Sequence, residues 1–408
     1  MMQLTTLANG LRVASRPMRS VETIAVGLYA AIGSRNEPAH LNGVAHLFEH
    51  MVFKGAGGRS AREISELVED VGGDLNASTD RELTAFYLSL LAADLKLGVN
   101  LLADLIQRPH FEAVHLELEK KVVLQELAEA QDTASDVVFD LLQEAAFGGQ
   151  ALGRSVLGEE QTIRAITTDD LYGWLSSQYV PQSLVLVGAG KLEHQRLVDL
   201  AEAAFGSMPP AAVPAQPPAD FTGGSRFGRR KSPQAHIAIA MAAPEWGSSD
   251  AYASQMFADV VGAGSSSRLF QELREEQGLA YSVASGAQNY ADAGLFWSYV
   301  ASDRGDAGRV HQEIERVLAE AAAGLEQRDL QRARALAKAG MMMSLESCWG
   351  QAGYLATRLL RDGALIEPAE IVARLDRVKL DEVRAVGTRM LAGPRAVASV
   401  GAKVALAA

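Results

Sequence analysis

The chain has 408 residues, enough for two or three domains with substantial cores, and its hydrophobic content of 48% and charged content of 22% are ordinary for a globular protein. A formal net charge of −12 argues against a nucleic-acid partner, because a phosphate-binding surface needs clustered Lys and Arg. The single cysteine, Cys348, excludes an intrachain disulfide and fits a reducing compartment.

The same sequence favours a soluble cytoplasmic protein with no membrane partner. No apolar run approaches the length of a membrane span. The first twenty residues carry three arginines and no acid, which faintly resembles a transit peptide, but they lack the apolar core of a secretory signal. A mitochondrial matrix location is therefore the weaker alternative.

The first half of the chain predicts alternating strands and helices. In chain order we expect a hairpin turn at 7–15 (LANGLRVAS), a buried strand at 23–32, a short helix at 42–55, a helix at 60–71 with a capping box from Ser60 and Glu63, an extended segment at 74–78, a strand at 82–91, helices at 93–106, 116–130, 135–147 and 166–180, and a strand at 184–187.

The short helix at 42–55 (NGVAHLFEHMVFKG) carries candidate chemistry. Asn42 is the expected N-cap and Gly55 the expected stop. At 100° per residue, one face is apolar and packs inward, and the opposite face carries His46, Glu49, His50 and Phe53. Two imidazoles one turn apart can bind a single metal ion, and the carboxylate beside them can hold a water. The order H-x-x-E-H is the reverse of the common zincin motif.

A third ligand has to come from elsewhere, because a catalytic zinc usually has three protein ligands. The helix at 116–130 is apolar nearly all round, including Leu118 and Val122, so we expect it to be buried. Glu119 and Glu126 nevertheless lie seven residues apart on one face of it. Buried carboxylates need a cation or hydrogen-bond donors, so one of the two is expected to bind the metal and the other to support a ligand.

The second half of the chain repeats the first. Five prolines between Pro209 and Pro218 predict a linker, giving domains at 1–207 and 233–408 joined by 208–232. IAVGLYA at 24 matches IAIAMAA at 237 (237 − 24 = 213), and Tyr87 matches Tyr299 (299 − 87 = 212). Moving the two histidines and Glu49 by 212 gives Ala258, Val261 and Gly262. We therefore expect an α+β protein of two homologous domains, each a mostly antiparallel sheet covered by helices, of which only the first has metal ligands.

HLFEHMVFKG, with EKKVVLQELAEA downstream, resembles the pitrilysin and mitochondrial processing peptidase family, and within it the small two-domain bacterial members. LANGLRV, NASTDRELTAFY, LGRSVLG and GAGSSSRLFQELREEQGLAYSV extend the resemblance over almost the whole chain. It implies a zinc metalloendopeptidase with one Zn²⁺ per chain. The implied ligands are His46, His50 and Glu126, the implied base is Glu49, and the implied supporting acid is Glu119.

The resemblance also implies where a peptide substrate binds. The extended segment with Asn76, Ala77 and Ser78 is the expected substrate strand, to which a peptide adds by main-chain hydrogen bonds. Phe53 is expected to line the pocket beyond the cleaved bond. Arg274 and Tyr281 are the expected carbonyl-binding pair, acting on the zinc domain of another subunit, so a clamshell homodimer is favoured over a heterodimer with a homologous chain.

Three questions about the site and its function remain open from the sequence. Asp136 and Asp140 either select basic residues of a peptide or are solvated helix acids. A chain of this family can serve as a non-catalytic core subunit of a larger complex, although such chains usually have an eroded metal motif. A structural zinc site needs a fourth protein ligand, and none is suitably spaced.

Overall fold

The computed structural model describes residues 1–213, 215–230 and 232–404, which form two compact units. The first unit is built from three segments, Met1–Leu127, Ser155–Pro217 and Met342–Glu367. The second comprises Ala128–Arg154, Pro218–Met341 and the described residues from Pro368 onward. Within the described chain, no helix is both long and apolar enough to cross a membrane.

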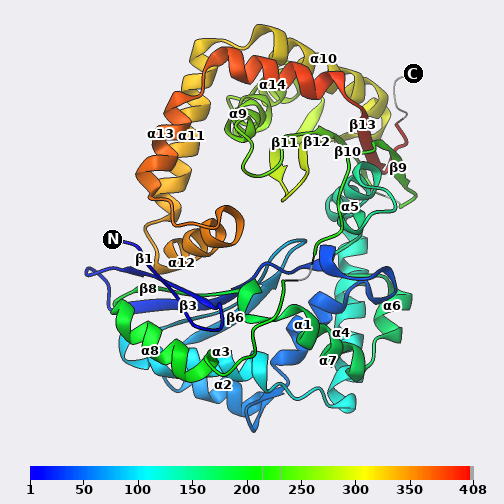
Figure 1. The fold of residues 1–408 in the computed structure, drawn as a ribbon. Helices are drawn as coiled ribbons and strands as arrows, with labels where there is room; N and C mark the ends of the chain where they lie inside the picture. The colour runs from blue at the N-terminus through cyan, green and yellow to red at the C-terminus, as the bar shows by residue number, and fades with distance from the viewer. Residues whose placement is uncertain (214, 231, 405–408) are drawn as a thin grey trace. The chain divides into compact units, whose positions relative to one another are not determined.

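The first unit is a six-stranded sheet with helices on both faces (Figure 1). Its strands, in order across the sheet, are β1 (Gln3–Thr6), β2 (Arg12–Pro17), β8 (Leu184–Gly190), β3 (Thr23–Ala30), β7 (Thr84–Leu91) and β6 (Asp74–Thr79). Its helices are α1 (Val44–Val52), α2 (Ala61–Glu69), α3 (Leu95–Gln107), α4 (Ala113–Asp132, which continues into the second unit), α6 (Glu160–Ala165), α7 (Thr168–Gln178), α8 (His194–Phe205) and α12 (Cys348–Thr357), followed by the π-helical turn η8 (Arg358–Asp362). A small hairpin, β4 (Gly55–Ala56) and β5 (Arg59–Ser60), follows α1.

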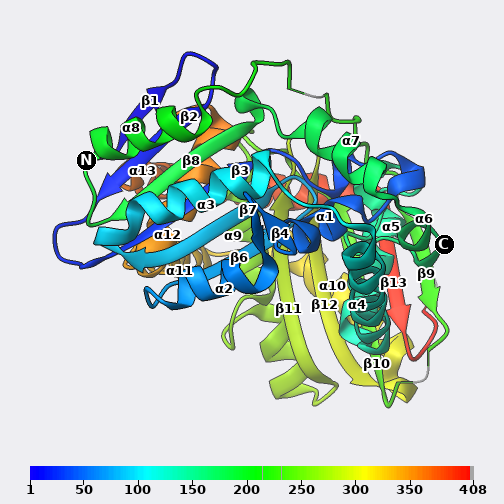
Figure 2. The same ribbon diagram turned by 90° about the horizontal axis from the view of Figure 1, so that it is seen from below.

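The main core of this unit lies between the sheet and the helices α1, α3, α7 and α8. Alternate residues of β3, such as Val26 and Leu28, face this core, and the helices contribute apolar side chains such as Phe48 and Leu102. Figure 2 shows α3 and α8 side by side across this face. The two strands expected at 23–32 and 82–91 and the hairpin at 7–15 are confirmed as β3, β7 and the β1–β2 turn, where Gly10 has a φ of 95°.

The second unit repeats the strand order of the first. Its sheet runs β11 (Ala280–Asn289), β12 (Gly294–Asp303), β10 (Gln234–Ala242), β13 (Arg395–Val400) and β9 (Gly224–Gly228). Its helices are α5 (Ala134–Ala146), α9 (Ala251–Gly262), α10 (Ala307–Gly324), α11 (Gln327–Ser344), α13 (Pro368–Arg377) and α14 (Leu380–Ala392), with a π-helical segment η6 (Phe270–Glu276). In each sheet a single parallel pair, β2–β8 or β9–β13, lies among antiparallel neighbours. The α+β fold of two homologous halves is confirmed.

The strand register corrects one detail of the repeat. Gly27 lies opposite Tyr87 in the first sheet, and Ala238 lies opposite Tyr299 in the second. The equivalent strands β3 and β10 are thus offset by 211 residues (238 − 27), not by the 213 that matching their apolar letters gave. Apolar strands align equally well at several registers, and only the cross-strand pairing identifies the equivalent positions.

The compact units also exchange helices relative to the domain boundaries expected at 207 and 233. Helix α12 and the turn η8, from the second half of the sequence, place Leu355 and Leu359 on the first sheet against Ala25 and Val187. Helix α5, from the first half, packs against β9, β10 and β13 of the second unit. The segment 208–232, expected to be a linker, contains the strand β9. Each sheet thus needs a helix from the other half of the chain to cover one face.

Candidate active site

The site is built on α1, a nine-residue helix whose inward face is fully buried through Val44, Leu47, Phe48 and Met51. His46 and His50 lie one turn apart on its other face, with side chains 14% and 18% exposed. Their ring centroids are 4.7 Å apart in an edge-on arrangement. The helical period therefore brings the two imidazoles together, as the sequence spacing predicted.

The prediction that Asn42 is the N-cap of α1 is wrong. The N-cap is Gly43, whose φ of 98° is in the left-handed region and whose Cα faces Gly158 so closely that a Cβ would lie 3.0 Å from the Gly158 Cα. The helix N–H groups are instead satisfied by the buried carboxylate of Glu37, which accepts from Gly43 N and Ala45 N at 2.9 Å each. Asn42 donates its amide to the same carboxylate at 2.8 Å. The helix also ends earlier than expected, at Val52.

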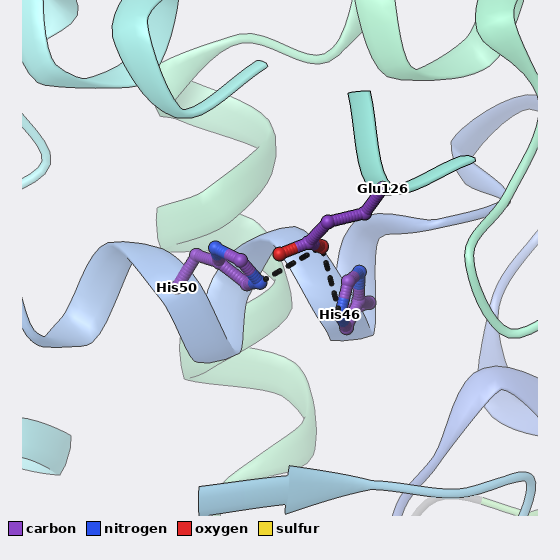
Figure 3. Close-up of side chains that lie close together, drawn as sticks. All are labelled: His46, His50 and Glu126. Carbon is purple, nitrogen blue, oxygen red and sulfur yellow. Dashed lines mark ion pairs between the residues drawn. The ribbon is translucent and has the colours of Figure 1, made fainter. Parts of the chain in front are cut away.

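Helix α4 supplies the third candidate ligand, Glu126, as Figure 3 shows. Its Oε2 lies 3.8 Å from Nε2 of His46 and 3.5 Å from Nε2 of His50. Two ligands bound to zinc at about 2.1 Å and at the tetrahedral angle are about 3.4 Å apart. The donor atoms of all three residues lie within 4.8 Å of one another, so two imidazoles and a carboxylate fit one zinc ion without rearrangement of the backbone.

Glu119 lies behind His50 rather than among the ligands. Its Oε2 is hydrogen-bonded to Nδ1 of His50 at 3.2 Å, and its Oε1 accepts from Lys54 Nζ at 2.9 Å. A carboxylate that accepts from Nδ1 leaves the Nε2 lone pair of the imidazole free for a metal. Sequence reasoning missed Lys54, although its position four residues after His50 is a signal of a shared face.

The environment of α4 corrects a second expectation. Glu119 is buried at 7% exposure, but Leu118 and Val122 are 51% and 42% exposed. The helix is therefore not buried all round, because its apolar residues occupy more of the circumference than the rest of the unit covers. Glu126, with a side chain 39% exposed, lies between the buried and the exposed faces.

Glu49 is held by a residue of the sheet edge. The Thr79 hydroxyl on β6 donates to Oε2 of Glu49 at 2.5 Å. Burial raises the pKa of Glu49, and the hydrogen bond from Thr79 opposes that rise. The nearby charges of His50 and Glu126 also act on this pKa, which shows that Glu49 shares their electrostatic environment. Thr79 was not identified from the sequence, because nothing local links it to a residue 30 positions away.

His46 is prepared for metal binding by its burial. Desolvation, with a smaller contribution from His50, lowers the pKa of His46 to about 4. The imidazole is therefore neutral near pH 7, and a neutral ring has a lone pair to offer. His46 is therefore suited to bind a metal through a ring nitrogen.

The extended segment expected at 74–78 is the edge strand β6 of the first sheet. Asn76 and Ser78 are exposed, whereas Ala77 is half-buried on the opposite face. The backbone N–H of Ala77 donates to the Asn76 side chain at 2.8 Å, so it is not used by β7. Phe53 caps α1 at its C-terminal end and is half-buried, with its ring 6.3 Å from that of Phe86.

The remaining candidate residues belong to the second unit. Arg274 lies in the π-helical segment η6, with its guanidinium 4.8 Å above the Phe270 ring. Tyr281 is the second residue of β11 and is 57% exposed. Asp136 and Asp140 are exposed on α5, where the charge of Asp136 contributes, after burial, to raising the pKa of Tyr299.

The equivalent place in the second unit is filled. Helix α9 corresponds to α1, and Ser285 of β11 donates to the backbone oxygen of Ala258 at 2.6 Å. A Cβ on Gly262 would lie 2.5 Å from the Ser285 hydroxyl. This helix and strand are so close that no histidine could stand between them. The repeat thus kept the fold, while the described positions of the second copy that match His46, Glu49 and His50 have neither the donors nor the room for a metal.

Comparisons with known proteins agree with this division. A family model described as insulinase (peptidase family M16) matches residues 12–160, and one described as the peptidase M16 inactive domain matches residues 165–336. An uncharacterized zinc protease of Streptomyces coelicolor is 34% identical over 410 residues, covering 97% of this chain and 89% of the relative. One of Mycobacterium leprae is 33% identical over 394 residues, covering 95% and 88%.

The mitochondrial-processing peptidase subunit beta of Lentinula edodes is 33% identical over 407 residues, covering 95% of this chain and 87% of its own. Among solved structures, a protease from Helicobacter pylori has a TM-score of 0.90 at 22% identity, with 98% of this chain and 99% of that chain covered. A peptidase M16 inactive domain from Pseudomonas fluorescens has a TM-score of 0.91 at 20% identity, with 99% and 98% covered. At these identities the two structures support the fold alone.

Proposed function

The chain belongs to the insulinase family of peptidases, peptidase family M16, and we propose that it is a zinc-dependent endopeptidase with one Zn²⁺ per chain. The observation that carries the proposal is the convergence of His46, His50 and Glu126 within 4.8 Å, with Glu49 on the same face of α1. The substrates we propose are unfolded peptides or presequence-like segments taken into a closed chamber. The lone Cys348 supports a reducing compartment such as the cytoplasm.

The residues divide the chemistry among them. Zinc in such a site acts as a Lewis acid that lowers the pKa of water to about 7 and polarises a peptide carbonyl. Glu119 orients His50 by accepting from its Nδ1, and Lys54 keeps that carboxylate paired. Thr79 occupies Oε2 of Glu49, so Oε1 is the atom that takes a proton from the attacking water and returns it to the leaving amine.

The edge strand β6 is the proposed docking strand for the peptide. Its Ala77 N–H is free of β7, so an extended peptide can accept from it once the Asn76 side chain moves aside. Ser78 and Phe53 then flank the peptide side chains. Asp136 and Asp140 remain candidates for binding the basic side chains of a peptide. If an Asp136→Asn/Asp140→Asn variant keeps the wild-type cleavage pattern, these two acids do not select basic residues.

The test is digestion of a basic peptide library by the purified chain, with and without a chelator, read by mass spectrometry. Glu49→Gln should lower kcat/KM by at least about a hundredfold while zinc content stays at the wild-type level. His46→Ala should lose both zinc and cleavage, and Glu112→Gln, at an exposed position, should change neither. A chain that binds zinc but cleaves nothing in wild-type form would instead be a scaffold or a structural zinc protein.

We also propose a homodimer in which Arg274 and Tyr281 bind the peptide carbonyl at the zinc site of the other subunit. The exposure of both side chains in the single chain supports this. Glu49→Gln and Arg274→Ala/Tyr281→Phe chains are each expected to be inactive alone. When the two are mixed and allowed to exchange subunits, one complete site per mixed dimer should restore part of the activity. No recovery in proven mixed dimers would refute action between subunits.

A further inference from the structure

A groove of about 810 Å³ lies at one end of the first sheet, lined by residues of the strand ends and by the first residues of α3 and α8. Strands β2 and β8 are parallel, and both run in the same direction as β7, because each of β8 and β7 is antiparallel to β3. The carboxyl ends of all three strands therefore lie at the same end of the sheet, where the groove is. Helix α3 follows β7 and helix α8 follows β8, and Figure 2 shows the two helices side by side.

Four cationic side chains line the groove, Arg19, Lys96, Lys191 and Arg196, against one acid, Glu193. Lys191 is paired with Glu22, which is 78% exposed. Among the described residues, Arg19, Lys96 and Arg196 have no ion pair or hydrogen bond. Three uncompensated cations around one hollow are notable in a chain with a net charge of −12, because acids were available to neutralise them.

The backbone adds to the same potential. Helices α3 and α8, of 13 and 12 residues, both begin at the groove, and a helix N-terminus offers free N–H groups and a partial positive charge. The His194 ring is already engaged, with 2.9 Å contacts from its two nitrogens to the hydroxyls of Thr5 and Ser15. The groove thus offers donors and positive charge, and both nitrogens of its imidazole are engaged by hydroxyls of the protein itself.

Two of the groove's cations have no cationic counterpart in the second copy of the domain. Gly190 and Gly401 are equivalent, since both follow the register of β8 and β13 and both have positive φ. Lys191 then corresponds to Ala402, and Lys96 corresponds to Gly308. Lys96 and Lys191 are therefore not required by the shared fold.

We propose that this groove binds a small ligand carrying two or more phosphate groups. A volume of about 810 Å³ is in the range of small-molecule sites. Phosphate oxygens accept from guanidinium, ammonium and helix N–H groups alike, and several cations around one hollow favour a polyphosphate over a single phosphate. The site is separate from the zinc site and does not depend on the proposed peptidase activity.

The test is isothermal titration of the full chain with tripolyphosphate and with orthophosphate, at low and at physiological salt. Tripolyphosphate should bind more tightly than orthophosphate, and its affinity should fall as salt rises. In Arg19→Gln/Lys96→Gln/Arg196→Gln the dissociation constant for tripolyphosphate should rise at least about tenfold. These side chains have no internal partners, so the melting temperature should be unchanged. Arg62→Gln, on exposed α2 outside the groove, is the matched control and should bind as wild type.

Because tripolyphosphate also chelates zinc, the titration is repeated on zinc-loaded and chelator-treated chain. Binding that requires zinc, binding that the triple variant retains, or no binding at all would each overturn the proposal. Co-sedimentation with phosphatidylglycerol vesicles separates a lipid headgroup from a free phosphate compound. Vesicle binding without tripolyphosphate binding would also overturn it.

Discussion

Single side chains set the chemistry of the site by contacts that cross large sequence separations. Thr79 donates to Glu49, Lys54 pairs with Glu119, and Glu119 orients His50. Two of these contacts fix one atom of a functional group, Oε2 of Glu49 and Nδ1 of His50, and leave its other polar atom free. The orientation of the base and of the metal ligands therefore depends on residues that themselves touch neither metal nor substrate.

Replacing Thr79 by Val should lower kcat by about tenfold or more, because a hydrogen bond to a charged acceptor contributes about 1.5–3 kcal/mol and its loss frees Glu49 to rotate. Thr79→Ser keeps the hydroxyl and should recover most of the rate. Steady-state kinetics on one fluorogenic peptide, with zinc content measured in parallel, checks this. A Val variant with the wild-type rate, or a Ser variant that loses as much as Val, would show that the hydrogen bond alone does not account for the rate.

His311 makes the stability of the chain depend on pH. It is 6% exposed on α10, and burial lowers its pKa, against a smaller opposing effect of Glu315. The folded state therefore resists protonation, so this stability is present above pH about 6.5 and is lost as pH falls through the lowered pKa. Urea unfolding at pH 7.5, 6.5 and 5.5 should show a fall that is smaller in His311→Gln, by at most about 1.4 kcal/mol per pH unit. Parallel curves would contradict it.

At the scale of one element, α1 is positioned by a carboxylate that precedes it in the chain. Glu37 is 1% exposed and accepts from two helix N–H groups and from Asn42. A negative charge at the N-terminus of a helix is favourable there, and three donors satisfy it. The helix that carries both histidines is thus anchored at the end nearer His46.

Glu37→Gln should weaken zinc binding by about tenfold and lower the free energy of unfolding by about 2 kcal/mol, because the amide group turns a donor toward N–H donors. Competition with a chromophoric chelator measures the first effect and urea unfolding the second. The matched control is Glu63→Gln, which alters the exposed cap of α2 and should leave zinc affinity unchanged. Unchanged zinc affinity in Glu37→Gln would show that the cap stabilises the fold without positioning the ligands.

At the scale of the whole molecule, the sequence halves and the compact units do not coincide. The first sheet needs Leu355 and Leu359 to cover one face, and the second sheet needs Val138 and Leu142 of α5. Two homologous halves that each lend a helix cannot both be complete when separated. The exchange links the folding of the metal-binding half to that of the other half.

A fragment of residues 1–207 should therefore expose apolar surface, because α12 is missing from its sheet and α5 has no sheet to cover. We expect it to bind the dye ANS and to aggregate. Joining residues 342–367 to it by a flexible linker should reduce both effects, whereas the same segment with Leu355→Asp/Leu359→Asp should not. A monodisperse fragment 1–207 with no dye binding would contradict the structural role of α12.

Much of the site follows from local spacing, and the sequence alone was sufficient for it. The 3.6-residue period places His46, Glu49 and His50 on one face whatever surrounds the helix, and the segment 74–78 was expected to be extended, as it is in β6. The duplication and the family could also be identified from the sequence, because both depend on motifs that occur in a fixed order along the chain. The third ligand was narrowed to two acids on one helix, and the resemblance selected Glu126.

Only the tertiary structure decided which partners meet. It replaced Asn42 by Glu37 at the helix start, paired Thr79 with Glu49, exposed Leu118 and Val122, and moved α5 and α12 between the halves. It also brought together the four cations of the groove, which lie in three separate stretches of the sequence. The physical reason is that periodicity fixes the direction of a side chain relative to its own element, whereas the neighbour it meets depends on how whole elements pack.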